Sequence, residues 1–184
     1  FGGALEPFSL LSVHVSRGKG PLAGLDQAHI TRVFPRIISD LGRISAGFSA
    51  LELVREFSPE HHPDPTIFET TLAFLEALEA PAVAAEPLLL CFEMRLLSIA
   101  GFAPDLERCG ACGKQPRADQ AGLFDQQQCH LVCRACGGAP YRLGGSVRAA
   151  LIRATGPEWR SAVEPAWPVN ELGEARTALR AFAE

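Results

Sequence analysis

Residues 92–113 read FEMRLLSIAGFAPDLERCGACG, and residues 129–138 read CHLVCRACGG. An apolar helical pattern runs into a Gly-Phe-Ala-Pro breaker, and two CxxC pairs follow: Cys109, Cys112, Cys133 and Cys136. The pairs are separated by 20 residues, an interval typical of a tetrahedral zinc site. A glycine follows each pair (Gly113 and Gly137), which suits the tight turn of a metal-binding knuckle. The pattern predicts an inserted metal module at residues 105–140.

Other uses of paired cysteines fit this chain less well. Disulfides need an oxidising compartment, and the chain shows no secretory signal. A redox CxxC normally follows a strand of a βαβ unit, whereas a helix precedes the first pair here. Iron at the same geometry, or a module that has lost its metal, stays open beside zinc. Four thiolates leave no open coordination position, so we predict that the zinc ion (Zn2+) is structural.

Some residues near these pairs could also be metal ligands. Cys129 lies four residues before Cys133 and could compete with it, although the paired spacing favours Cys133. Cys91 lies within the apolar helix and is most simply a small buried residue. His61 and His62 form a pair in a polar loop, without a carboxylate or further histidine at ligand spacing.

The composition predicts a globular protein with a weakly acidic charge. Hydrophobic residues make up 47% of the 184 residues, and no apolar run approaches the length of a membrane-spanning helix. The chain begins and ends within predicted elements, so we expect a fragment at both ends. The net charge is −4, but residues 1–43 carry five basic against three acidic side chains. Affinity for phosphate is therefore expected at the N-terminal end.

The order of the elements predicts a β-hairpin followed by helices. Residues 11–16 alternate apolar and polar, a glycine-rich basic turn follows, and residues 22–33 form a weaker strand pattern. Apolar residues then recur at helical spacing over residues 44–57 and 68–78. Asp64 and Pro65 mark the start of the second helix. Further helices are expected at 88–100, at 146–154 with Ser146 as N-cap, and at 171–184, with a linker over 81–87.

The chemistry that the sequence lacks argues against an enzyme. It contains no GxGxxG, P-loop, GxSxG or HExxH motif. Its scattered carboxylates form no recognisable acid–base pair. We therefore predict a binding protein.

The sequence resembles the RecO family of bacterial DNA-repair and recombination mediators. The resemblance rests on FEMRLL at 92–97, GFAPDLERC at 101–109 and the four cysteines, and it extends to FGGALEPF at 1–8 and to Asp64-Pro65. It implies a mainly α-helical C-terminal domain at 37–184 with the inserted four-cysteine zinc module. It also implies that residues 1–36 are the β-hairpin remnant of an N-terminal OB-fold. The family's basic N-terminal segment is missing here.

The resemblance also implies a function: binding of single- and double-stranded DNA, strand annealing, and loading of RecA with RecR and single-strand-binding protein. The implied location is the bacterial cytoplasm, at the nucleoid and not in a membrane. Four residues are the candidate phosphate contacts: Arg17, Lys19, Arg32 and Arg36. Arg95, Arg148 and Arg153 are the candidates for holding the acidic, Phe-ending tail of single-strand-binding protein. The alternative is a zinc-ribbon scaffold that binds only proteins.

Overall fold

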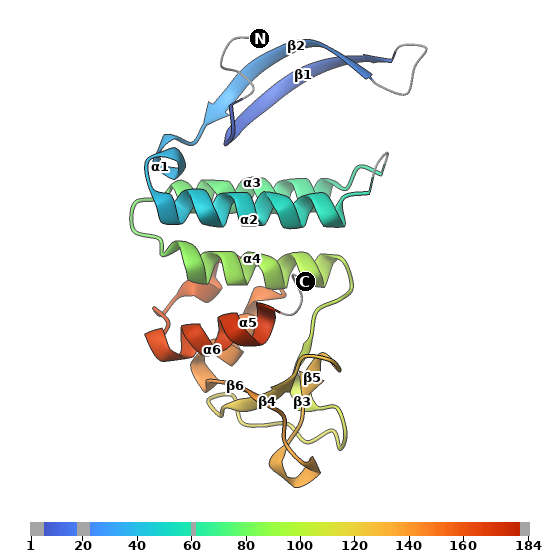
Figure 1. The fold of residues 1–184 in the computed structure, drawn as a ribbon, viewed down its shortest axis with the longest axis vertical. Helices are drawn as coiled ribbons and strands as arrows, with labels where there is room; N and C mark the ends of the chain where they lie inside the picture. The colour runs from blue at the N-terminus through green and yellow to red at the C-terminus, as the bar shows by residue number, and fades with distance from the viewer. Residues whose placement is uncertain (1–5, 18–22, 60–61, 181–184) are drawn as a thin grey trace.

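The computed structural model describes residues 6–17, 23–59 and 62–180. Figure 1 shows an elongated molecule in which a β-hairpin, successive helical layers and a small sheet follow one another along the long axis. The prediction of a mainly helical chain with a hairpin and a cysteine module is confirmed. Within the described residues, no helix is long and apolar enough to cross a membrane.

The hairpin consists of β1 (Ser9–Arg17) and β2 (Ala23–Val33), which pair antiparallel. Leu10 lies opposite Arg32 at its base and Arg17 opposite Ala23 at its tip, with two register shifts between them. The predicted turn falls on residues outside the described set. Side chains of both strands are about half exposed, among them Val13, Val15, Ile30 and Val33. A two-stranded sheet with so much apolar surface in contact with water is only marginally stable by itself.

Four helices follow the hairpin: α1 (Pro35–Ile38), α2 (Leu41–Phe57), α3 (Pro65–Glu79) and α4 (Ala85–Ile99). Asp64 caps α3 as predicted, since its carboxylate accepts hydrogen bonds from the backbone amides of Thr66 and Ile67. α4 packs against both α2 and α3, and its side chains Phe92 and Met94 are fully buried. The predicted linker was too long, because α4 begins at Ala85 within it.

The other face of α4 packs against α5 (Gly145–Ala154) and the 3-10 turn η3 (Trp159–Val163). The last helix, α6 (Val169–Leu179), packs against α5 and the module, and its Arg176 pairs with Glu86 of α4. The prediction of Ser146 as N-cap of α5 was wrong. Gly144 is the N-cap, and the carboxylate of Glu171 from α6 accepts hydrogen bonds from the Ser146 hydroxyl (2.6 Å) and the Val147 amide (3.2 Å). A negative charge at this helix end is favourable.

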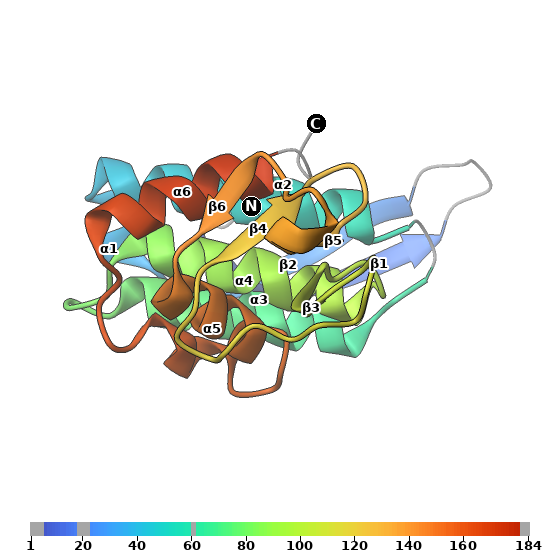
Figure 2. The ribbon, with the colours of Figure 1, turned by 90° about the horizontal axis from the view of Figure 1, so that it is seen from below.

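The cysteine module is a small sheet between α4 and α5. Its elements are β3 (Asp105–Cys109), β4 (Gly122–Asp125), β5 (His130–Leu131), η2 (Arg134–Cys136) and β6 (Tyr141–Leu143). The strand order is β3-β5-β4-β6, with β3 and β5 parallel and the other pairs antiparallel. Phe124, Leu131 and Leu143 are buried and join the core of the helical part. Figure 2, viewed from below, shows the module in front of the helices, where β6 packs against α6 and β3 against α5.

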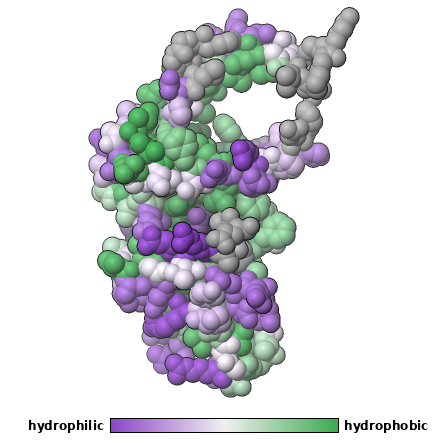
Figure 3. Space-filling model, viewed as in Figure 1, coloured by the Kyte–Doolittle hydropathy of each residue, from purple (hydrophilic) through white to green (hydrophobic). Residues whose placement is uncertain are grey.

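An apolar hollow of about 860 Å³ lies between the base of the hairpin and the helices α2 and α3. Leu10, Phe34, Leu51, Phe68 and Leu75 are among the residues that line it. On the face drawn in Figure 3, hydrophobic surface gathers at the hairpin and the helical layer beside it, while the middle of the molecule is more hydrophilic. The hairpin end is therefore the more apolar end of this face.

Candidate metal centre and nucleic-acid interface

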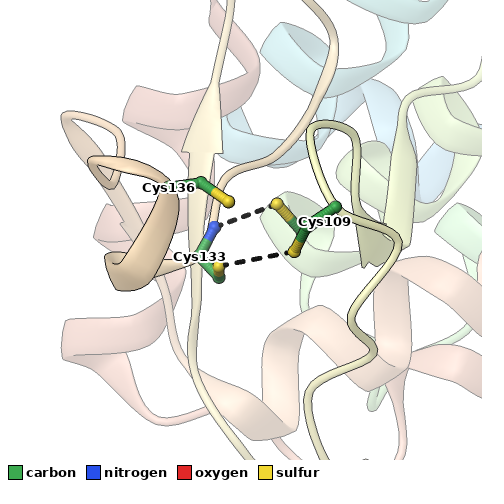
Figure 4. A group of neighbouring side chains, drawn as sticks. Cys109, Cys133 and Cys136 are labelled. Atoms are coloured by element: carbon green, nitrogen blue, oxygen red, sulfur yellow. Dashed lines mark hydrogen bonds between the residues drawn. The ribbon is translucent and has the colours of Figure 1, made fainter.

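The four cysteines of the CxxC pairs come together at one point. Cys109 ends β3 and Cys112 lies in the next turn, while Cys133 precedes η2 and Cys136 ends it. Their Sγ atoms all lie within 4.8 Å of one another. Figure 4 shows Cys109, Cys133 and Cys136 turned toward a common centre.

The spacing of the sulfur atoms fits a metal and not a disulfide. The Sγ atoms of Cys112 and Cys133 are 3.7 Å apart, whereas bonded sulfurs are separated by about 2.05 Å. Tetrahedral zinc with bonds of about 2.3 Å to sulfur places its ligands about 3.8 Å from one another. Because all four ligands are thiols, the donor set suits a structural ion without an open position.

Backbone hydrogen bonds shape the two knuckles. The amide of Gly113 donates to the Cys109 carbonyl (2.8 Å), and the amide of Gly138 donates to the Cys133 carbonyl (3.1 Å). Gly113 and Gly137 have φ values of +74° and +106°, in the left-handed region that glycine adopts readily. The prediction that these two glycines permit the tight turns agrees with this geometry.

The electrostatics of the cluster favour a thiolate at Cys109. The backbone amide of Cys133 donates to the Cys109 sulfur (3.3 Å) and, with other knuckle amides, lowers the pKa of that thiol to about 6. Hydrogen bonds with the thiols of Cys133 and Cys112 raise the pKa of Cys136 to about 12. A cation that binds the four sulfurs must displace the protons that the thiols carry.

The remaining cysteines lie apart from the cluster. The thiol of Cys129 donates to the carbonyl of Gln126 (3.4 Å), and the residue has a φ of +56° just before β5. Cys91 is fully buried in α4, where burial raises its pKa to about 12. Of the histidine pair, His61 lies outside the described residues, and His62 belongs to no metal-like cluster among those described.

The contacts of two residues that support the module, His130 and Arg148, were not predicted from the sequence. The ring of His130 covers Gly110 so closely that a Cβ there would overlap it. Arg148 from α5 is only 2% exposed, and its guanidinium donates to the carbonyls of Leu106, Arg117, Ala118 and Gln120. Neither the close approach to Gly110 nor the set of carbonyls can be identified from residue spacing.

The structure does not bring the candidate phosphate contacts into one patch. Arg17 ends β1 at the tip of the hairpin, and Lys19 lies outside the described residues. Arg32 lies at the base, about 20 Å away along the strands, where it pairs with Glu76 of α3 and lies over the Phe34 ring. Arg36 is exposed at the start of α1.

The three arginines considered for peptide binding are also dispersed. Nη1 of Arg95 donates to the Thr155 carbonyl (2.7 Å), and Nη2 of exposed Arg153 donates to the Glu164 carbonyl (3.3 Å). The placement of Arg148 corrects the prediction of a surface contact, because its side chain is enclosed between α5 and the module. In this conformation a peptide on the surface cannot contact Arg148.

Comparison with known proteins identifies relatives along the whole chain. Residues 38–184 match the family described as "Recombination protein O C terminal". The chain is 45% identical over 139 residues to the DNA repair protein RecO of Pelobacter propionicus, an alignment that covers 75% of this chain and 55% of the relative. It is 40% identical over 191 residues to the DNA repair protein RecO of Anaeromyxobacter sp. (strain K), covering 100% of this chain and 73% of the relative. The DNA repair protein RecO of Geobacter sulfurreducens is 36% identical over 97% of this chain and 72% of its own length.

Proposed function

Because this chain belongs to the RecO family, we propose that it is a DNA-repair protein that binds DNA without catalysing a reaction. The finer role is that of a recombination mediator, which anneals strands and loads RecA together with RecR and single-strand-binding protein. The observation that carries the proposal is the match of the family over residues 38–184, together with relatives named DNA repair protein RecO. The charge of the N-terminal region supports a DNA contact there.

The four clustered cysteines hold one structural zinc ion in this proposal. Metal binding to such a site supplies free energy for folding, on the order of 10 kcal/mol in small zinc-finger peptides. The module here also has buried apolar side chains that continue the helical core. We therefore expect the ion to order residues 105–140 and to leave the helices folded when it is removed.

Phosphate binding through the hairpin can be tested by salt dependence. Each phosphate that a cation neutralises releases counterions, so affinity for a labelled single strand should fall steeply with salt. The double variant Arg17→Ala and Lys19→Ala should flatten this dependence, whereas Arg55→Ala should not, because Arg55 lies on α2 and pairs with Glu56. If the slope of log affinity against log salt concentration is unchanged in the double variant, the hairpin tip does not contact phosphate.

Recruitment by single-strand-binding protein is a separate part of the proposal. An acidic peptide that ends in Phe needs an apolar pocket for its ring and a cation for its carboxylate. Arg95 and Arg153 remain candidates, and Arg153 is the more exposed of the two. Saturable binding of a labelled tail peptide that is lost when its Phe is deleted supports the idea, and no binding at hundreds of micromolar contradicts it.

A scaffold that binds only proteins is the second candidate, and the apolar hollow beneath the hairpin favours it. The two candidates differ in one measurement. Strong loss of DNA affinity with rising salt belongs to a phosphate-binding protein, whereas a protein-only scaffold shows no such binding at all.

A further inference from the structure

Each knuckle of the metal centre carries one unpaired cation. Lys114 follows Cys112 by two residues, and Arg134 directly follows Cys133; both are exposed. In the described parts of the chain, neither side chain has a hydrogen bond or ion pair with a neighbour. The other exposed arginines of the module region are paired with carboxylates: Arg108 with Asp105, Arg117 with Asp119, and Arg142 with Glu174. Among the described cations of the module, Lys114 and Arg134 are therefore the two that remain available to a ligand.

The fold places these two cations at the same end of the molecule. The amide of Cys109 donates to the Lys114 carbonyl (2.9 Å) and closes the first knuckle. The sulfurs of Cys112 and Cys133, one from each knuckle, are 3.7 Å apart. In Figure 1 this end, with the orange η2 turn, is the one farthest from the hairpin. A single chemical group of a ligand therefore cannot contact both this end of the module and the hairpin tip.

A shallow hollow of about 440 Å³ lies beside Arg134. It is lined by Leu123, Arg134, Gly137, Gly138, Ala139 and Pro140. A Cβ added at Gly137 would meet nothing within 4 Å, so the backbone is open to close approach there. The amides of Gly137 and Gly138 already donate to the carbonyls of Arg134 and Cys133. The lining therefore offers a few aliphatic side chains, a comparable share of polar surface and one guanidinium, without free backbone donors of these two glycines.

We propose that this end of the module binds single-stranded DNA, with Lys114 and Arg134 on its phosphates and a base in the hollow. The inference rests on the proposed DNA-binding function and adds a second contact to it. The aliphatic side chains of Leu123, Ala139 and Pro140, beside the Arg134 guanidinium, can contact the face of an unstacked base, which a duplex does not offer. The amides of Gly137 and Gly138 already have acceptors, so they cannot donate hydrogen bonds to the edge of a base. The affinity should therefore depend little on which base is bound. The same cations could instead neutralise the thiolates of a loaded metal site, and the experiment separates the two roles.

The experiment uses the zinc-loaded chain and a labelled oligothymidine strand, with affinity measured by anisotropy over a range of salt concentrations. The double variant Lys114→Ala and Arg134→Ala should weaken binding about tenfold at low salt and reduce the slope of log K against log salt by about 1.4, since two phosphate contacts are lost. Zinc content and melting temperature should not change. The matched control, Arg55→Ala with Arg117→Ala, removes the same charge from two ion-paired side chains and should keep the wild-type slope.

Three results would overturn the inference. A slope unchanged in the Lys114 and Arg134 variant removes these cations from the phosphate contacts. An equal loss in the matched control shows that net charge alone is responsible. A variant that loses zinc along with affinity shows that the two cations serve the metal centre. If the wild-type chain itself binds no DNA, the proposed function fails as well, whereas the first two results leave that function in place.

Discussion

The guanidinium of Arg148 on α5 donates a hydrogen bond of 2.8 Å from Nη1 to the backbone carbonyl of Leu106 on β3. These residues are 42 positions apart, and the bond connects the helical part directly to the strand that ends at the first metal-site cysteine. Nη2 and Nε reach three more carbonyls between the knuckle and β4, at 2.6 to 3.1 Å. Burial lowers the pKa of Arg148, but a guanidinium remains charged in proteins. This side chain therefore links the module to α5, in addition to the core contacts of Phe124, Leu131 and Leu143.

Replacing Arg148 by methionine should destabilise the protein by about 3 kcal/mol or more, because it leaves several buried carbonyls without donors. Urea denaturation measures the loss, and hydrogen exchange should locate it in residues 105–120. Arg153→Met is the control, since Arg153 is exposed and makes one long bond of 3.3 Å; it should cost less than about 0.5 kcal/mol. Equal unfolding midpoints for the two variants would contradict the role given to Arg148.

The choice of zinc ligands can be tested by two serine variants. Cys133→Ser removes a sulfur of the four-thiol cluster and should empty the site, whereas Cys129→Ser should keep the metal, because the Cys129 thiol is engaged with the Gln126 carbonyl. Metal content is measured on the purified proteins, and chelation of the wild type should increase hydrogen exchange only in residues 105–140. An empty site in Cys129→Ser would show that the ligand assignment is wrong.

Two glycine-to-alanine variants should change stability in opposite directions. A Cβ at Gly145 would overlap the carbonyl oxygen of Asp119, so α5 or the 117–120 segment must shift, at a cost of about 2 kcal/mol. At Gly173 in α6 nothing lies within 4 Å of the added atom, and alanine should stabilise the helix by about 0.5–1 kcal/mol. The melting temperatures of the two variants test these predictions. If Gly145→Ala is as stable as the wild type, the overlap with the Asp119 carbonyl oxygen is easily relieved.

Glu93 on α4 should make the protein less stable as the pH rises. Burial raises the pKa of its carboxyl group from 4.5 to about 7, so the folded protein keeps a proton that the unfolded chain has already released. Between these values folding is coupled to proton uptake, and stability falls with increasing pH. Glu93→Gln should therefore be more stable than the wild type at pH 8, by up to about 3 kcal/mol, and nearly equal to it at pH 4.

The measurement for Glu93 is urea denaturation at several pH values. Glu52→Gln is the control, since Glu52 on α2 is exposed, and this variant should follow the wild-type pH dependence. Glu52 and Glu93 both line a groove between α2, α4 and α6. A constant difference between Glu93→Gln and the wild type at all pH values would mean that the carboxyl group does not titrate in this window.

Local features of the fold could be predicted from the sequence because their signals lie within a few residues. Asp64 before Pro65 is sufficient to start α3, since an N-cap bonds to amides two and three positions ahead. The alternation over residues 11–16 is sufficient for a strand, and the CxxC spacing for a knuckle. The cysteine cluster was also predictable, because each pair is local and two pairs at this interval have few other uses.

The tertiary structure alone decided how these parts are joined. Ser146 has the residue type of an N-cap, but the carboxylate of Glu171, 25 residues later, takes that place at α5. The sequence suggested Arg148 as a surface cation, yet it is enclosed because four carbonyls of the module converge on it. Glu171 and Arg148 form hydrogen bonds with partners that are far away in the sequence. Residue type and local spacing therefore cannot predict these bonds. Only the packing of the module against α5 and α6 determines which side chains are buried and which cations remain free.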